Sequence, residues 1–190
     1  MNFVFVVPNL AGGGAEKAIL KLSRILLAHG HRVDLLLLEK RVDHIGADGP
    51  VEGLTLHCLA DKAPHGWLGK RLLAAKLKRR LANLGAVPDL VVSTLPFADE
   101  IAALAQLPRH WCRIANTLGS EIAQLATHQP AKARRRRQRY QKIYGSRGLI
   151  AVSAGVGADL RASLGISSRI EVIGNAFDFA AMRMAAKRVE

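Results

Sequence analysis

The chain has 190 residues, of which 49% are hydrophobic and 23% are charged. These values predict one compact folded domain, argue against a disordered or fibrous chain, and leave no room for a second full domain. The 28 basic residues outnumber the 15 acidic ones, and the formal net charge of +13 favours anionic partners such as phospholipid, nucleic acid or a phosphorylated substrate.

Apolar runs that favour β-strands alternate along the chain with stretches of helical periodicity. The predicted strands span residues 3–7, 32–38, 54–59, 89–94, 111–116, 149–153 and 169–173. The predicted helices span residues 15–29, 67–84, 98–107 and 158–164, and the basic stretch before residue 149 is also predicted to be helical. Gly30 and Gly165 can end two of these helices in a left-handed conformation. The alternation predicts an α/β fold: a Rossmann-like, doubly wound, mostly parallel sheet with helices on both faces.

Cysteine and histidine usage gives no sign of a disulfide or a metal site. Cys58 and Cys112 are far apart and each lies in an apolar stretch, so both are expected to be buried free thiols, which fits a reducing cytoplasm. The seven histidines are scattered and include no HExxH motif, so no metal is expected. The apolar start has no basic leader and is broken by Pro8 and Asn9, so neither a signal peptide nor a spanning helix is expected.

The sharpest local feature is a glycine loop, Gly12, Gly13 and Gly14, followed by Ala15 and Glu16 at the start of the first predicted helix. Ligands of open α/β sheets bind beyond the carboxyl ends of the strands, and free N–H groups at a helix N-terminus attract phosphate. Glycines let the backbone approach closely. The spacing matches neither GxGxxG nor a P-loop, so the loop indicates a phosphate-binding site or, alternatively, a flexible turn without a ligand.

Three segments in correct order resemble glycosyltransferase family 4. The segment GGGAEKAILKLSRILLAHGHRVDLLLL resembles the opening of the family, where a GG-AE loop leads the first helix and GH-V leads the second strand. LIAVSAGVGADLRASLGI resembles the end of the N-terminal domain, and RIEVIGNAFDFAAM resembles the strand and linker before the C-terminal domain. The linker usually reads N-P-x-D, so Asn175 and Asp178 match, whereas Ala176 replaces the proline.

The resemblance implies the N-terminal half of a GT-B enzyme, in which two Rossmann-like domains face each other across a cleft. Residues 1–174 would form the acceptor-side domain, and residues 175–190 the linker at the start of a missing C-terminal domain. In the family that second domain binds most of the nucleotide sugar and carries the E-x7-E carboxylates. No catalytic residue is therefore assigned here, and this chain alone is expected to be inactive.

The resemblance also implies a retaining, hexosyltransferase-like reaction without a metal or other cofactor. The glycine loop, from Gly12 to Glu16, would approach the phosphates of donor or acceptor. In that mechanism the donor phosphate helps to remove the acceptor proton, so this half would contribute positioning rather than a nucleophile.

Three further residues are candidates for binding the acceptor. Asn116 stands at a strand end where many relatives carry a histidine; an amide cannot act as a general base, but it can hydrogen-bond a hydroxyl. Asn116 and the adjacent Thr117 could instead form a helix cap or a turn. Ser153 also ends a strand, and there a capping role is favoured over ligand binding. Glu16 could cap its own helix or touch the acceptor.

Two basic segments account for the excess charge: residues 70–80 hold six basic residues and residues 132–142 hold seven, with no acid in either. Basic helices commonly lie on anionic membranes, and relatives with lipid-linked acceptors dock this domain on the inner membrane face. The sequence therefore predicts peripheral binding at the cytoplasmic membrane and a lipid-linked or cell-envelope saccharide acceptor, or else plain solvated helices. The candidate membrane-binding residues are Lys76, Lys78, Arg79, Arg80, Arg134, Arg135, Arg136 and Arg137.

Nucleic acid is the rival partner, because arginine runs neutralise phosphates regardless of sequence. Aromatic residues make up only 5% of the chain, and just Tyr140 and Tyr144 lie near the second basic segment, so no stacking platform is indicated. A non-enzymatic basic module that binds RNA or anionic membrane is the alternative function.

Overall fold

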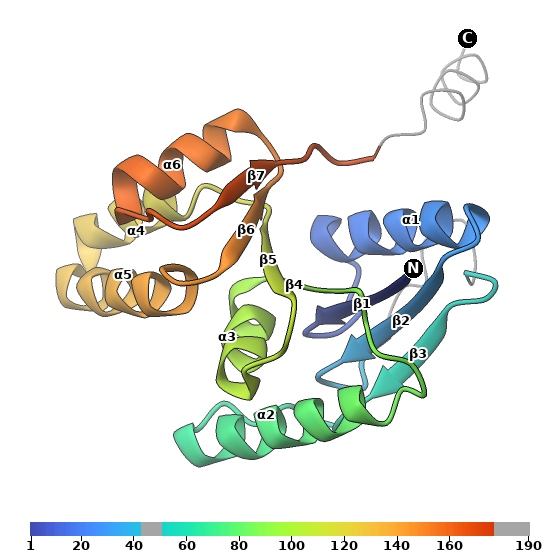
Figure 1. Cartoon of the computed structure of the whole chain (residues 1–190). Coiled ribbons are helices and arrows are strands. Elements are labelled where there is room, and N and C mark those ends of the chain that lie inside the picture. Colours follow the sequence, from blue (N-terminus) through green and yellow to red (C-terminus); the bar gives the residue numbers. More distant parts are fainter. Residues whose placement is uncertain (43–50, 177–190) are drawn as a thin grey trace, which may run out of the picture.

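The computed structural model of the chain describes residues 1–42 and 51–176 (Figure 1). In these residues seven strands form one sheet in the order β3-β2-β1-β4-β5-β6-β7, and every neighbouring pair is parallel. The strands are β1 (Asn2–Val7), β2 (Arg32–Leu37), β3 (Thr55–Cys58), β4 (Leu90–Thr94), β5 (His110–Ile114), β6 (Gly148–Ala151) and β7 (Ile170–Val172). The predicted α/β sheet is confirmed, and its described strands are parallel throughout.

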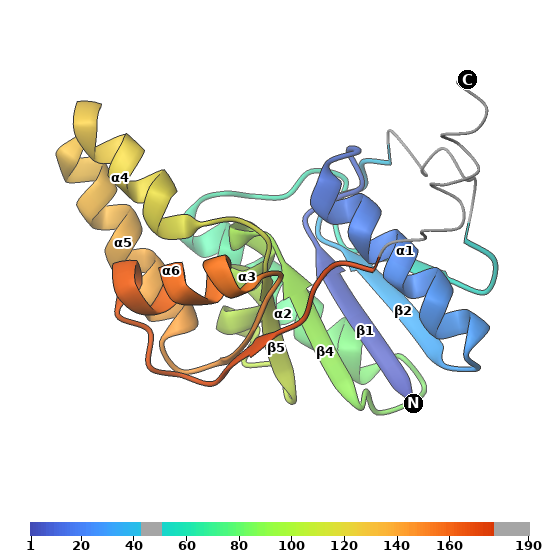
Figure 2. The ribbon, with the colours of Figure 1, turned by 90° about the horizontal axis from the view of Figure 1, so that it is seen from above.

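Helices cover both faces of the sheet, as predicted (Figures 1 and 2). The described helices are α1 (Gly14–Ala28), α2 (Trp67–Ala82), α3 (Pro96–Ala105), α4 (Leu118–His128), α5 (Pro130–Tyr144) and α6 (Ala154–Leu164). On one face, Phe5 and Val7 of β1 belong to the core under α1, whereas Val4 and Val6 belong to the core under α2 and α3 on the other. Helices α5 and α6 lie on the same face as α2 and α3, and α4 packs on α5 and α6.

Burial on both faces explains the uninterrupted apolar sequences of the central strands. All side chains from residue 35 to residue 38 are fully buried, so this run shows no alternation. Helix α2 buries Leu73, Leu77 and Leu81 at helical spacing. Each fully buried leucine contributes about 1.5–3 kcal/mol, which is enough to fix the face that α2 turns toward the sheet.

Two helix predictions differ from the structure. The basic stretch before β6 is helical, as predicted, and forms α5, but a separate helix that the sequence did not predict, α4, precedes it; Pro130 in the first turn of α5 separates the two. Helix α6 begins at Ala154 rather than at residue 158, because Ser153 caps it. Gly30 and Gly165 follow α1 and α6 with left-handed φ values of 75° and 67°, as predicted.

Cys58 is exposed, which contradicts the prediction that both cysteines are buried. It lies in β3, the edge strand, where Leu56 is also 41% exposed. The sequence of an apolar edge strand resembles that of a central strand, so the exposure could not be predicted. Cys112 in β5 is buried, and both thiols are free.

The chain after β7 is described only as far as Ala176. Most of the predicted linker, including Asp178, lies outside the described residues. Asn175 and Ala176, the first two linker residues, lie beyond the carboxyl end of β7.

Candidate functional site

The glycine loop lies at the carboxyl end of β1, where the strand order reverses between β1 and β4. Such reversal points are where ligands of doubly wound sheets bind. Leu10 N donates to Arg41 O at 2.8 Å, and Ala11 N donates to Asn9 Oδ1 at 3.1 Å. Gly12 has a φ of 98°, which favours glycine. The loop is therefore anchored before it reaches α1.

The N-terminus of α1 has no side-chain cap. Gly13 is its N-cap residue, with φ −70° and ψ 165°, Gly14 is the first helical residue, and both are exposed. A Cβ at Gly14 would meet nothing within 4 Å, so the space beside the first turn is open. Uncapped N–H groups at the positive end of the helix dipole suit a phosphate.

Glu16 is packed against Gly13. It is buried in the first turn of α1, and a Cβ on Gly13 would collide with its carboxylate. The helix dipole stabilises a carboxylate at this position. Gly13 therefore makes room for Glu16, whereas Gly14 faces open space.

The carboxyl end of β4 has a strained backbone. Leu95 has a φ of 74° and precedes Pro96 in the first turn of α3. A left-handed conformation costs a non-glycine residue about 1–3 kcal/mol, and such strain is common at ligand sites. Because of this turn, α3 starts directly at the sheet edge.

Arg113, at the carboxyl end of β5, was given no role by the sequence. Its buried guanidinium donates to Thr94 Oγ1 at 3.3 Å and also to Asn175 Oδ1. Burial lowers the pKa of Arg113. The side chain ties the first residue of the linker motif to β4 and β5. The available signal was a single arginine within the apolar run of β5.

Asn116 and Thr117 are exposed in the loop between β5 and α4. Within the described residues neither side chain makes a hydrogen bond, so the cap that was considered for Asn116 is not formed. Asp159 of α6 caps α4 instead, because its Oδ2 accepts from Gly119 N at 2.8 Å. Both side chains therefore remain available to an acceptor hydroxyl.

Ser153 follows β6 and caps α6. Its Oγ accepts from Val156 N at 3.2 Å, which is the structural role that the sequence favoured. Its hydroxyl proton is still available for a second hydrogen bond, because a hydroxyl can donate and accept.

All the predicted ligand-binding residues therefore lie at the carboxyl ends of the strands, in separate loops after β1, β5 and β6. Because neighbouring strands are about 4.8 Å apart and β4 lies between β1 and β5, the glycine loop and Asn116 follow strands that are about 10 Å apart. No three histidine, cysteine, aspartate or glutamate side chains come together as a potential metal site in residues 1–42 and 51–176.

A buried polar network that the sequence did not reveal lies behind these strand ends. Asp99 of α3 accepts hydrogen bonds from Ser93 Oγ and from Tyr144 Oη, the latter at 2.8 Å. Ser93 Oγ also lies 2.8 Å from His110 Nε2. His110 Nδ1 is buried without a partner among the described residues. The network joins α3, α5, β4 and β5.

Burial shifts the protonation of this network. It raises the pKa of Asp99 from 3.8 to about 7, although the hydrogen bonds from Ser93 and Tyr144 oppose the rise. It lowers the pKa of His110 from 6.5 to about 4, and the charge of Arg147 adds to that effect. Beside Asp99 lies a cavity of about 10 Å³, which also touches Asn116. That volume holds about one water molecule.

The two basic segments are brought to the same face of the sheet, on α2 and α5, with α3 between them (Figure 1). Lys76, Lys78, Arg79, Arg134 and Arg135 are exposed. Arg80 contacts His57, Arg136 pairs with Glu121, and Arg137 donates to Ser163 O, so these three are partly engaged. No helix in the described part of the chain is long and apolar enough to cross a membrane.

Among known protein families, the model of glycosyltransferase family 4 matches residues 12–181. The chain belongs to glycosyltransferase family 4. The match spans the glycine loop, the candidate acceptor residues and the start of the linker. A search of curated proteins found no match to this family 4 chain.

Solved structures confirm the fold of this family 4 domain. Sucrose-phosphate synthase from Thermosynechococcus elongatus is similar with a TM-score of 0.67 and 14% identity, over 98% of this chain and 52% of that one. A ugt transferase from Siraitia grosvenorii in complex with UDP gives a TM-score of 0.60 and 10% identity, over 99% and 55%. Apo UGT2 of Phytolacca americana gives a TM-score of 0.59 and 12% identity, over 98% of this chain and 55% of that one. These proteins have the GT-B fold, and the chain spans about half of each.

Proposed function

We propose that this chain is the acceptor-side domain of a glycosyltransferase that moves a sugar from a nucleotide-sugar donor to a lipid-linked or cell-envelope saccharide acceptor, with retention of configuration. Residues 1–174 form this domain, and residues 175–190 lead into a C-terminal domain that binds most of the donor. The chain without that domain does not turn over.

The observation that carries the proposal is the uncapped, glycine-lined N-terminus of α1 at the reversal point of a family 4 sheet. Gly12, Gly13, Gly14 and Ala15 offer backbone amides to a phosphate, and the open space beside Gly14 lets it approach. The similar ugt transferase from Siraitia grosvenorii was solved in complex with UDP, which supports a nucleoside diphosphate as one ligand of the cleft.

Acceptor binding is assigned to the loops that follow β5 and β6 at the carboxyl ends of the strands. Asn116 and Thr117 have exposed side chains without a partner in the described residues, and Ser153 has a spare donor. Sugar hydroxyls suit such groups because each can donate and accept. Since none of the three is a general base, this half orients the acceptor and leaves proton removal to the donor phosphate.

Membrane docking is assigned to the face that carries α2 and α5. The exposed cations on these two helices are Lys76, Lys78, Arg79, Arg134 and Arg135. Each cation near an anionic bilayer contributes about 1 kcal/mol. Docking there brings the domain to a lipid-linked acceptor at the inner face of the cytoplasmic membrane. No metal or other cofactor is assigned.

The test is a transfer assay with the protein that carries both domains, a panel of labelled nucleotide sugars and vesicles that contain lipid-linked saccharide. We expect label in a lipid-extractable product whose new linkage keeps the anomeric configuration of the donor, read by NMR. An inverted linkage would overturn retention. Label released only as free sugar, with every acceptor tried, would count against transfer to a saccharide.

A further inference from the structure

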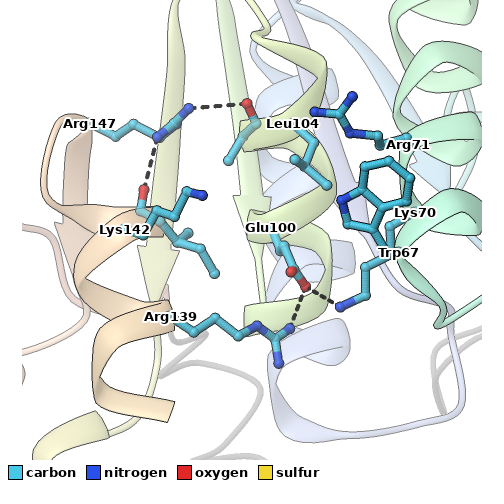
Figure 3. A pocket seen from close by; sticks show the side chains of 10 residues that line it. Trp67, Lys70, Arg71, Glu100, Leu104, Arg139, Lys142 and Arg147 are labelled. Atoms are coloured by element: carbon cyan, nitrogen blue, oxygen red, sulfur yellow. Dashed lines mark hydrogen bonds and ion pairs between the residues drawn. The ribbon is translucent and has the colours of Figure 1, made fainter. Parts of the chain in front are cut away.

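A groove of about 390 Å³ lies away from the strand ends, on the face of the sheet that carries the basic helices (Figure 3). Its floor is α3, and its walls are α2 on one side and α5 on the other. Its charged side chains are Lys70, Arg71, Glu100, Arg139, Lys142 and Arg147. Five of these six are cationic, so the groove has four excess positive charges.

The two ends of the groove differ in charge balance. At one end Glu100 lies between two cations, because its Oε2 is 2.8 Å from Lys70 Nζ and 2.5 Å from Arg139 Nη2. At the other end Arg71 and Lys142 extend from opposite walls toward Leu104 (Figure 3). Neither has a carboxylate partner in the part of the chain that the structure describes.

Arg147 completes the end without carboxylates. Its Nη1 donates to Ile143 O at 3.0 Å, and its Nη2 donates to Ala103 O at 3.1 Å. These bonds hold the guanidinium between α3 and α5, so this cation is already in position before any ligand arrives. Three cations from two helices and one loop therefore line the groove without pairing to an acidic side chain of the described residues, because Glu100 pairs with Lys70 and Arg139 instead.

Apolar groups lie beside these charges. Trp67 is 72% exposed, and the guanidinium of Arg71 lies 4.9 Å from the centre of its ring. Leu104 is exposed on the floor, and Leu68 and Leu72 are exposed on the same turns of α2 as Trp67 and Arg71. Exposed large apolar side chains next to a cationic pocket suit an anionic molecule that has an apolar part.

Charge argues against a second copy of this chain as the occupant, and the aromatic content of the groove argues against single-stranded nucleic acid. A second copy of this chain carries a net charge of +13 and would be repelled. Single-stranded nucleic acid needs several aromatic platforms for successive bases, and Trp67 is the one aromatic side chain that lines the groove among the described residues. An anionic lipid fits both the cations and the exposed apolar side chains of the groove, because its phosphate needs cations and its acyl chains need apolar surface.

We propose that this groove binds the phosphate headgroup of a single anionic phospholipid of the membrane surface. Arg71, Lys142 and Arg147 contact the phosphate, while Trp67, Leu68 and Leu72 enter the interfacial layer. The inference rests on the proposed membrane docking and deepens it, because it replaces diffuse attraction by one stoichiometric headgroup site.

The direct test uses Trp67 as a reporter. In a Trp111→Phe background Trp67 is the remaining tryptophan, since the chain has two. Short-chain phosphatidylglycerol below its micelle concentration is titrated while tryptophan emission is followed. We expect a saturable change with a stoichiometry of one, and none with short-chain phosphatidylcholine.

A charge-matched pair of variants locates the site. Arg71→Gln/Lys142→Gln removes two cations from the groove, and Lys76→Gln/Arg135→Gln removes two from the same helices outside it. We expect the groove variant to lose at least tenfold more affinity for phosphatidylglycerol than the control. Equal losses, a response that does not saturate, or equal binding of phosphatidylcholine would each overturn the groove site. Displacement of the lipid by structured RNA at lower concentrations would also overturn it.

Vesicle sedimentation separates this inference from the docking on which it rests. If the wild-type chain sediments with anionic vesicles but shows no one-to-one titration, the headgroup site is wrong and the proposed docking stands. If the titration succeeds without sedimentation, the headgroup site stands and the docking is wrong.

Discussion

Gly13 and Gly14 are adjacent, but the structure gives them different constraints. A side chain at Gly14 enters open space, whereas one at Gly13 must displace the buried Glu16 carboxylate. We expect Gly14→Val to change the free energy of unfolding by less than about 1 kcal/mol, as is usual for substitutions without a steric conflict. Urea unfolding of the chain measures this change. A larger loss would mean that Gly14 has a structural role.

Asp99 and His110 titrate so that their effects on stability oppose each other. The folded chain keeps a proton on Asp99 between pH 3.8 and about 7 that the unfolded chain has lost, so stability falls as pH rises. The unfolded chain keeps a proton on His110 between about pH 4 and 6.5 that the folded chain has lost, so stability rises with pH. The two slopes nearly cancel up to pH 6.5.

Asp99→Asn removes one of these slopes and leaves the other. The pKa difference of about three units at Asp99 corresponds to about 4 kcal/mol. We therefore expect the variant to gain a few kcal/mol of stability relative to wild type as the pH rises from 4 to 7. Urea unfolding at several pH values measures the difference. A difference that stays constant with pH would show that Asp99 ionises normally.

Single residues were predictable from the sequence only where a local pattern carries their role. The glycine loop is such a pattern, because three glycines after a strand are visible without a structure. The roles of Arg113 and Asp99 could not be predicted in this way. Arg113 binds Asn175, which is 62 residues away, and Asp99 binds Tyr144, which is 45 residues away. Only the parallel sheet brings these pairs together.

Helix α6 depends on a cap that is also a proposed ligand group. Removing the Ser153 hydroxyl leaves Val156 N without its acceptor. We expect Ser153→Ala to lower the free energy of unfolding by about 1 kcal/mol, and Ser153→Asp, which can still accept, to restore most of it. Thermal unfolding of the three proteins tests this. Equal melting temperatures would show that the cap contributes nothing.

Helices α2 and α5 carry the proposed docking charge at exposed positions. Replacing Lys76, Lys78, Arg134 and Arg135 by glutamine keeps every ion pair that the structure shows. We expect the variant to sediment less with anionic vesicles than the wild type does. This difference should be largest at low salt, and the melting temperature should be unchanged. If binding to the vesicles is unchanged, these helices are ordinary solvated surface.

The sequence predicted most elements because strand and helix periods are local properties. The contacts between elements are not local, which explains two of the errors. Helix α4 has no local cap signal, since its cap is Asp159 from α6, so the sequence did not separate it from α5. Cys58 has an apolar sequence context, but β3 is at the sheet edge. The cationic groove was also hidden, because it joins α2, α3 and α5.

In the molecule as a whole, the proposed ligand groups from three loops lie at the carboxyl ends of the strands, and cations from α2 and α5 lie on one face of the sheet (Figure 1). The proposed binding of a phosphate by the helix end at the strand reversal would account for the glycines there. The basic face explains where the net charge of +13 is placed. Family 4 membership and a chain that spans about half of its solved structural neighbours fit one domain of a two-domain enzyme.

In the proposed reaction the glycine loop receives a phosphate during sugar transfer. The most direct measurement compares the transfer rate of the protein carrying both domains with that of its Gly14→Val variant, at matched folding stability. We predict a loss of about 100-fold or more, the size expected when backbone donors to a developing charge are blocked. Transfer within about twofold of wild type by a folded Gly14→Val protein would contradict this claim.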